Sequence, residues 1–174
     1  GTLVNATRAL TGTVSDDVGV ARVEFYVDGI LRWTDFTDPY SVAWDTTKET
    51  EGPHTLLAIA YDGAGNSASA PKSVIVDNTA PLVTIEKPLA GQTISGISQV
   101  SGTASDSNKV QQIQLLVDGV VLGVRPVSPY QTFLSWSFTY DSSIIGNGEH
   151  TLGIVALDLA GNKGTASVKV NVQN

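Results

Sequence analysis

The 174 residues carry a net charge of −7, 41% of them are hydrophobic, and none is cysteine or methionine. The acidic balance argues against a nucleic-acid partner, which requires clustered lysine and arginine, and no apolar run approaches the ~18 residues of a membrane helix. Without cysteine there is neither a disulfide framework nor a thiolate metal site, and without methionine we expect a processed chain or a piece of a longer one.

The first clear strand is predicted over residues 21–27, ARVEFYV, where apolar side chains alternate with others. A period of two indicates a strand with one buried face. Asp28-Gly29 follows and suits a two-residue hairpin turn that needs positive φ. Residues 54–61 are apolar on both faces, as expected of a central strand. We expect a first core of Val23, Phe25, Trp44, Leu56 and Ala58.

A long internal repeat organises the chain. HTLLAIAYDGAGN (54–66) returns as HTLGIVALDLAGN (150–162), an offset of 150 − 54 = 96 residues. TGTVSDDVGVARVEFYVDG (11–29) matches SGTASDSNKVQQIQLLVDG (101–119) at an offset of 90. The second copy therefore carries about 96 − 90 = 6 extra residues, which we place within QTFLSWSFT (131–139). Such self-similarity indicates tandem units.

The repeat predicts two domains, residues 1–78 and 79–174, joined at Thr79-Ala80-Pro81. Short strands separated by turn signals favour an all-β sandwich for each. The second copy opens with LVTIEKPLAG (82–91), which has no counterpart in the first. We therefore expect the first domain to have an open sheet edge and lower stability, with residues 2–5 partly filling the gap. We expect a second core of Ile113, Leu115, Tyr140, Leu152 and Ile154.

The ordered motifs GTxSD, VxxVDG, PYxxxWDTT and HTLxxxAxDxAGN, with NTAPxVxI at the junction, resemble the bacterial Ig-like domain family. The resemblance covers nearly the whole chain and implies two tandem immunoglobulin-like β-sandwiches, the first lacking its opening strand. The second copy departs from it at Tyr140, where the family usually has tryptophan, and at its insertion.

The same resemblance implies spacer or accessory modules of a larger exported bacterial protein, at the cell surface or outside the cell. It implies no catalytic residues and no enzyme activity. Neighbouring domains of the same polypeptide are the expected partners, with a surface glycan or protein ligand as a further candidate through adhesion.

The two histidines, His54 and His150, occupy equivalent positions in separate copies. A metal-binding or general-base role would need partners that the neighbouring sequence does not supply. We therefore predict a structural role for both rings, beside the entry to a strand.

The tryptophans test an alternative function, a carbohydrate-binding module, which requires exposed aromatic side chains. Trp44 and Trp136 alternate with apolar residues and are expected to point inward. Trp33 aligns with Gly123 and is the candidate for stacking on a sugar. A hydrolase fragment, the third possibility, would require clustered acids in a cleft. Buried Trp44 and Trp136 without a cleft would favour the spacer interpretation.

The acids on the sandwich-end loops are explained most simply as turn caps. However, Asp106 and Asp158 are expected at the end of the second sandwich where the linker arrives with Asp77. Asp77, Asp106 and Asp158 are therefore candidate ligands of an interdomain calcium ion, with Glu49 and Glu51 as further acids facing the gap. No cofactor is required by this interpretation, and calcium is the single candidate.

Overall fold

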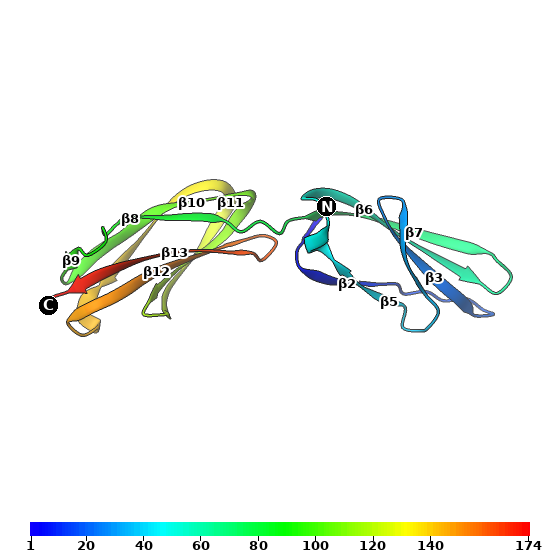
Figure 1. The fold of residues 1–174 in the computed structure, drawn as a ribbon, viewed down its shortest axis with the longest axis horizontal. Helices are drawn as coiled ribbons and strands as arrows, with labels where there is room; N and C mark the ends of the chain where they lie inside the picture. Colours follow the sequence, from blue (N-terminus) through cyan, green and yellow to red (C-terminus); the bar gives the residue numbers. More distant parts are fainter. The chain divides into compact units, whose positions relative to one another are not determined.

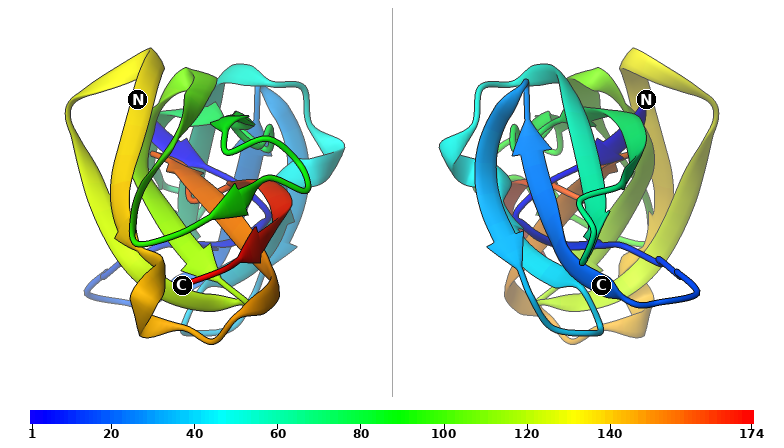
Figure 2. Two further views of the ribbon diagram at one scale, coloured as in Figure 1. Left: turned by 90° about the vertical axis from the view of Figure 1, so that its left-hand side faces the viewer. Right: turned by 90° about the vertical axis from the view of Figure 1, so that its right-hand side faces the viewer.

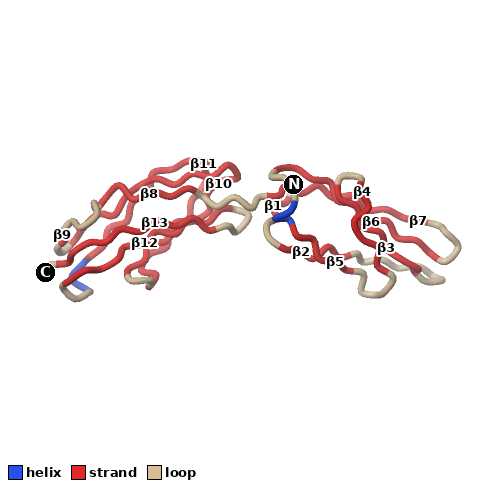
Figure 3. Tube along the Cα trace, viewed as in Figure 1, coloured by secondary structure: helices blue, strands red, loops and turns tan.

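A computed structural model describes all 174 residues and divides them into two compact units, Gly1–Asn78 and Thr79–Asn174. Figure 1 labels most strands of each unit, and Figure 3 adds β1 and β4 and shows that strands make up most of both units. Two single turns of 3-10 helix, η1 (Thr46–Lys48) and η2 (Ser142–Ile144), occupy equivalent places in the two units. The all-β prediction is confirmed.

The first unit is a sandwich of two sheets, with one sheet ordered β1-β7-β6-β3-β4 and the other made of β2 and β5. An end-on view shows these strands around the interior (Figure 2, right). The strands are β1 (Thr2–Val4), β2 (Thr7–Thr11), β3 (Val20–Val27), β4 (Ile30–Asp35), β5 (Ser41–Asp45), β6 (Gly52–Asp62) and β7 (Ser67–Val76).

The predicted alternation in the first unit is confirmed along β3, where Val23, Phe25 and Val27 are buried. Asp28 and Gly29 then make the predicted turn, with φ of 51° and 78°. Positive φ at both central residues matches the right-handed twist of the two strands that the turn joins. β6 is central, because it pairs with β3 on one side and β7 on the other.

In the second unit, β11, β10, β12, β13 and β9 are neighbours in that order, and β8 pairs with β10 (Figure 2, left). The strands are β8 (Leu82–Lys87), β9 (Thr93–Ile94), β10 (Ile97–Val117), β11 (Val120–Asp141), β12 (Gly148–Asp158) and β13 (Lys163–Val172). β10 pairs with β8 over residues 101–105 and with β12 over residues 110–117, with a register shift between these parts. Such a shift lets one strand pass from one layer of a sandwich to the other.

The extra residues of the second copy lie within β11. Residues 131–139 continue this strand without a break, whereas the first unit has β4 and β5 separated by residues 36–40. The insertion therefore lengthens a strand instead of adding a loop.

The two cores differ. The five residues predicted for the second core are buried within one cluster, whereas the first unit has two separate clusters. Val23, Phe25 and Trp44 are buried as predicted, but Leu56 and Ala58 are only half-buried. The prediction is wrong for these two because no strand covers their face of β6.

The first unit has no counterpart of β8, as the sequence predicted. Residues 2–5 do not fill the gap, and that expectation is wrong. Thr2–Val4 pairs in parallel with β7, which is the place that β9 takes beside β13 in the second unit. The edge of β2 away from β5 stays unpaired.

Candidate functional site

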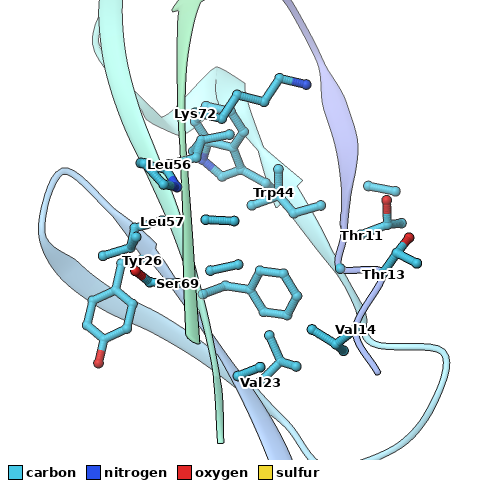
Figure 4. A pocket seen from close by; sticks show the side chains of 18 of the residues that line it. Thr11, Thr13, Val14, Val23, Tyr26, Trp44, Leu56, Leu57, Ser69 and Lys72 are labelled. Atoms are coloured by element: carbon cyan, nitrogen blue, oxygen red, sulfur yellow. The ribbon is translucent and has the colours of Figure 1, made fainter. Parts of the chain in front are cut away.

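A groove of about 670 Å³ opens between the two sheets of the first unit. Figure 4 shows Thr11 and Thr13 on one side, Leu56 and Leu57 on the other, and Trp44 between them. Most lining residues are apolar or small, and the charged ones are Arg8 and Lys72. The sequence predicted an open sheet edge in this unit. It did not predict a cleft. The spacer interpretation was to be favoured by buried tryptophans without a cleft, and the groove means that the second condition is not met.

A smaller hollow of about 190 Å³ lies beside Asp16 and Asp62. Asp62 accepts backbone N–H bonds from Ala64 and Asn66 and a side-chain bond from Asn66, at 2.6–2.9 Å. The Asn66 side-chain amide is the main reason that the pKa of Asp62 lies below its usual value. Asp16 accepts the N–H groups of residues 18 and 19. Both acids cap their own turns, and the large groove contains no carboxylate, so a glycosidase-type acid pair has no support here.

Each histidine joins a hairpin turn to the loop before the next strand. His54 Nδ1 lies 2.6 Å from Asp28 Oδ2, and Nε2 lies 2.8 Å from the Thr50 carbonyl oxygen. His150 repeats this, with 2.6 Å to Asp118 Oδ2 and 2.9 Å to the Gly146 carbonyl oxygen. All four partners are acceptors, so both nitrogens of each ring act as donors in the imidazolium form.

The surroundings favour charge on both rings. Burial of His54 opposes the charge, but the Thr50 carbonyl and the Asp28 carboxylate outweigh it, so the pKa of His54 lies above its usual value. The Asp118 carboxylate raises the pKa of His150, with burial opposing it. With both nitrogens engaged, neither ring is placed to bind a metal or act as a base, and the structural role predicted for them accounts for their contacts.

The tryptophans do not form a sugar-binding platform. Trp44 and Trp136 are 1% and 2% exposed, as predicted. Trp33, the candidate for stacking, is partly buried and packs against both core clusters of the first unit. The aromatic residues that are largely exposed are Phe36, Tyr130 and Phe133.

The calcium candidates are all buried. In the second unit, Asp106 and Asp158 offer carboxylate oxygens within 4.8 Å of each other. Asp158 also accepts three hydrogen bonds from its own loop, and Asp106 accepts the N–H of Asn108. Asp106 was expected in a loop, but it lies within β10, where the register shifts.

The carboxylates of Glu49 and Glu51 form hydrogen bonds within the first unit, which also contains Asp77. Asp77 is fully buried just after β7, and its N–H donates to the Val4 carbonyl. Glu49 bonds to Trp44 and Arg32, and Glu51 accepts the N–H of Asn78.

The family model described as bacterial Ig domain matches residues 1–58 and 81–154. The fibronectin(III)-like modules of Clostridium thermocellum CbhA are similar in structure, with a TM-score of 0.64 and 24% identity over 99% of this chain and 88% of theirs. An endo-β-1,4-mannanase of Thermotoga petrophila is similar over 66% of this chain and 29% of its own, with a TM-score of 0.43 and 19% identity. At these identities the likeness concerns the fold alone. No curated protein matches the chain significantly, and no helix is long and apolar enough to cross a membrane.

Proposed function

The chain belongs to the bacterial Ig domain family, and from this premise we propose that its two units are non-catalytic accessory modules of a larger exported bacterial protein. One observation carries the proposal: the side chains best suited to chemistry are committed to structural hydrogen bonds. Both nitrogens of His54 and His150 are engaged, and the Asp62 carboxylate caps its own turn. Modules of this kind hold or extend a neighbouring domain and contribute to adhesion at the cell surface.

The proposed mechanism depends on the linker. Thr79-Ala80-Pro81 is short and ends in a residue of fixed φ, which limits swinging more than a flexible linker would. NMR relaxation of the intact chain should then give similar rotational correlation times for the two units. Inserting eight glycine and serine residues after Ala80 should shorten both times. Unchanged values would contradict a stiff spacer.

Binding to polysaccharide tests the alternative, a carbohydrate-binding module. We expect no retention of the chain on insoluble cellulose, mannan or mixed-linkage glucan, and no release of sugar from them. The exposed side chains of Phe36, Tyr130 and Phe133 are the observation that keeps the alternative open. Retention that is abolished by Phe133→Ala but kept by Trp33→Ala would replace the spacer proposal with the alternative.

We also propose that Asp77, Asp106 and Asp158 bind calcium. The support is that two buried carboxylates, Asp106 and Asp158, approach closely within one unit, and a hard divalent cation would relieve their repulsion. Asp77 precedes the linker by two residues and would supply a further oxygen.

The calcium proposal is tested by thermal unfolding with calcium and with a chelator. Calcium should raise the midpoint, since a ligand at a hundred times its Kd stabilises the folded state by about 2.7 kcal/mol. Asp106→Ala should abolish the shift, while Asp62→Ala, which removes a turn cap in the first unit, should keep it. An identical unfolding midpoint with calcium and with the chelator would contradict the calcium proposal.

A further inference from the structure

The last residue of the first unit, Asn78, bonds to both sheets of that unit. Its Oδ1 atom accepts the N–H of Ala6 at 2.9 Å and lies 3.0 Å from the hydroxyl oxygen of Thr46. Its Nδ2 atom donates to the Thr46 carbonyl oxygen at 3.0 Å. Ala6 directly precedes β2 and Thr46 directly follows β5, while Asn78 follows β7. One amide side chain therefore joins the end of one sheet to the end of the other, and we call these three residues the exit cluster.

The exit cluster is closed by further contacts. The backbone nitrogen and the hydroxyl oxygen of Thr46 lie 2.9 and 2.7 Å from the Ala6 carbonyl oxygen, and Thr46 is 0% exposed. The N–H of Asn78 donates to the Glu51 carboxylate, at 3.1 Å from each oxygen. Because Thr46 is buried, removal of the Asn78 side chain would leave its polar groups with fewer partners where water does not reach them.

The second unit repeats this cluster. Asn174 Oδ1 accepts the N–H of Gly96 at 3.1 Å and the hydroxyl of Ser142 at 2.9 Å, and Nδ2 donates to the Ser142 carbonyl oxygen at 2.9 Å. Ser142 is 0% exposed, as Thr46 is. Gly96 has a φ of 59° and its equivalent Ala6 has a φ of 54°, a conformation that alanine rarely adopts. The same geometry is therefore built from different residues at two of its positions, and the asparagine is the residue that both clusters share.

Asn78 holds the chain beyond the end of the sheet. The paired residues of β7 end at Val76, and the N–H of Asp77 donates to the Val4 carbonyl oxygen. Asn78 comes next and directly precedes Thr79-Ala80-Pro81. The ends of strands fray readily, and each frayed residue adds to the length of chain that moves with a linker. The effective length of the linker therefore depends on what holds Asn78.

We propose that Asn78 is the residue that stiffens the exit of the chain from the first unit. Its side chain ties the backbone to both sheets immediately before the linker, and this stops the end of β7 from moving with the linker. The role rests on the spacer function proposed above. The contacts themselves lie wholly within the first unit, so they set the stiffness of this exit independently of the second unit.

The test compares Asn78→Ala with the unsubstituted 174-residue chain, both labelled with nitrogen-15. The Ala6 amide loses its acceptor and should exchange with solvent at least about tenfold faster. The NMR order parameters of residues 77 and 78 should fall, because these report motion on the picosecond-to-nanosecond scale. The rotational correlation times of both units should shorten, in the direction expected for the glycine and serine insertion.

Asn174→Ala is the matched control, because it removes the equivalent contacts from the second unit. It should speed exchange of the Gly96 amide by a similar factor. It should leave the exchange of Ala6 and the correlation times of both units unchanged.

A second pair of variants does not require Asn78→Ala to fold. Thr46→Ser keeps the hydroxyl, as Ser142 does in the second unit, and should match the unsubstituted chain. Thr46→Val keeps the shape of the side chain but removes the hydroxyl, so it should lower the order parameter of residue 78. Identical order parameters for the serine and valine variants would contradict the role of the exit cluster.

Unchanged exchange of Ala6 in Asn78→Ala would overturn the proposal, and so would an equal shortening of the correlation times by Asn174→Ala. Faster exchange without shorter correlation times would also overturn it if the unsubstituted chain tumbles as a stiff spacer. If the correlation times of the unsubstituted chain are already short, the spacer function fails by itself. The exchange of Ala6 and the order parameters of residues 77 and 78 then still decide whether Asn78 holds the exit.

Discussion

The two units share one sequence pattern but differ in burial at equivalent positions. The alternate apolar residues of β12 between Leu152 and Ala156 are 0% exposed, whereas their equivalents in β6 between Leu56 and Ala60 are half-buried. The strands are paired in the same way within their sheets. The comparison teaches that a strand's own pattern decides which face turns inward, while a neighbouring strand decides whether that face is closed to water.

The largest expected consequence is a difference in stability. The first unit lacks the equivalents of Val83 and Ile85, and burying two such side chains is worth about 3–6 kcal/mol, at ~1.5–3 kcal/mol each. Native-state hydrogen exchange of the intact chain should therefore show lower protection in β6 than in β12. The free energies of opening should differ by roughly the same 3–6 kcal/mol. Equal protection of the two strands would mean that the missing cover has no energetic effect.

A glycine pair sharpens the comparison. Gly102→Ala should destabilise the second unit by about 1–3 kcal/mol, because the new Cβ atom overlaps the Thr84 carbonyl and forces β8 away. Gly12→Ala should leave the first unit unchanged or stabilise it by up to about 1 kcal/mol, through a less flexible unfolded chain. Hydrogen exchange resolved by unit distinguishes the two effects. Similar losses from both substitutions would contradict an open groove.

The smallest expected effect concerns the histidines. Asp118→Asn should lower the pKa of His150, because it removes the main group that favours its charge. Asp28→Asn should lower the pKa of His54 by more, because water screens the more buried ring less from the carboxylate that is removed. The His54 side chain is 5% exposed and that of His150 is 16% exposed. NMR titration of the ring protons measures both, and equal shifts would contradict the comparison.

The same contacts set a pH dependence. Each raised histidine pKa contributes stability that is complete below the ordinary value of 6.5 and is lost as the pH rises through the folded value. The pKa values of Asp28 and Asp118 are lowered, chiefly by the N–H groups of Thr55 and Thr151, so their contribution is complete above 3.8 and is lost as the pH falls. Each pair therefore stabilises its unit most between these two values.

The sequence predicted the sandwich, the hairpin turns and most of the core, because these depend on local alternation and on Asp-Gly pairs. It placed residues 2–5 in the wrong sheet, since so short a segment has no pattern that distinguishes pairing with β2 from pairing with β7. It also predicted Leu56 and Ala58 as buried, because their pattern matches that of Leu152 and Ile154. The pattern of one strand does not show whether a neighbouring strand is missing.

The groove itself had a signal in the sequence. Gly12 aligns with Gly102, and a glycine held at the same place in two copies indicates a close backbone approach. Asp106 was misplaced because GTASDSN is typical of a loop by composition, whereas β10 is paired with β8 and β11 up to Ser105 and continues past Asp106 to Val117. Tertiary neighbours override local propensity at such positions.

The parallel pairing of β1 with β7 has a mechanical consequence. Thr2 lies opposite Val74 and Val4 opposite Val76, so the start of β1 and the end of β7 lie at opposite ends of the paired stretch. A pull on residues 1 and 78 would slide the two strands past each other lengthwise, so the hydrogen bonds between them would bear the load together instead of opening one at a time. The resistance of the first unit to tension then depends on the three residues of β1 and not on whether the groove is covered.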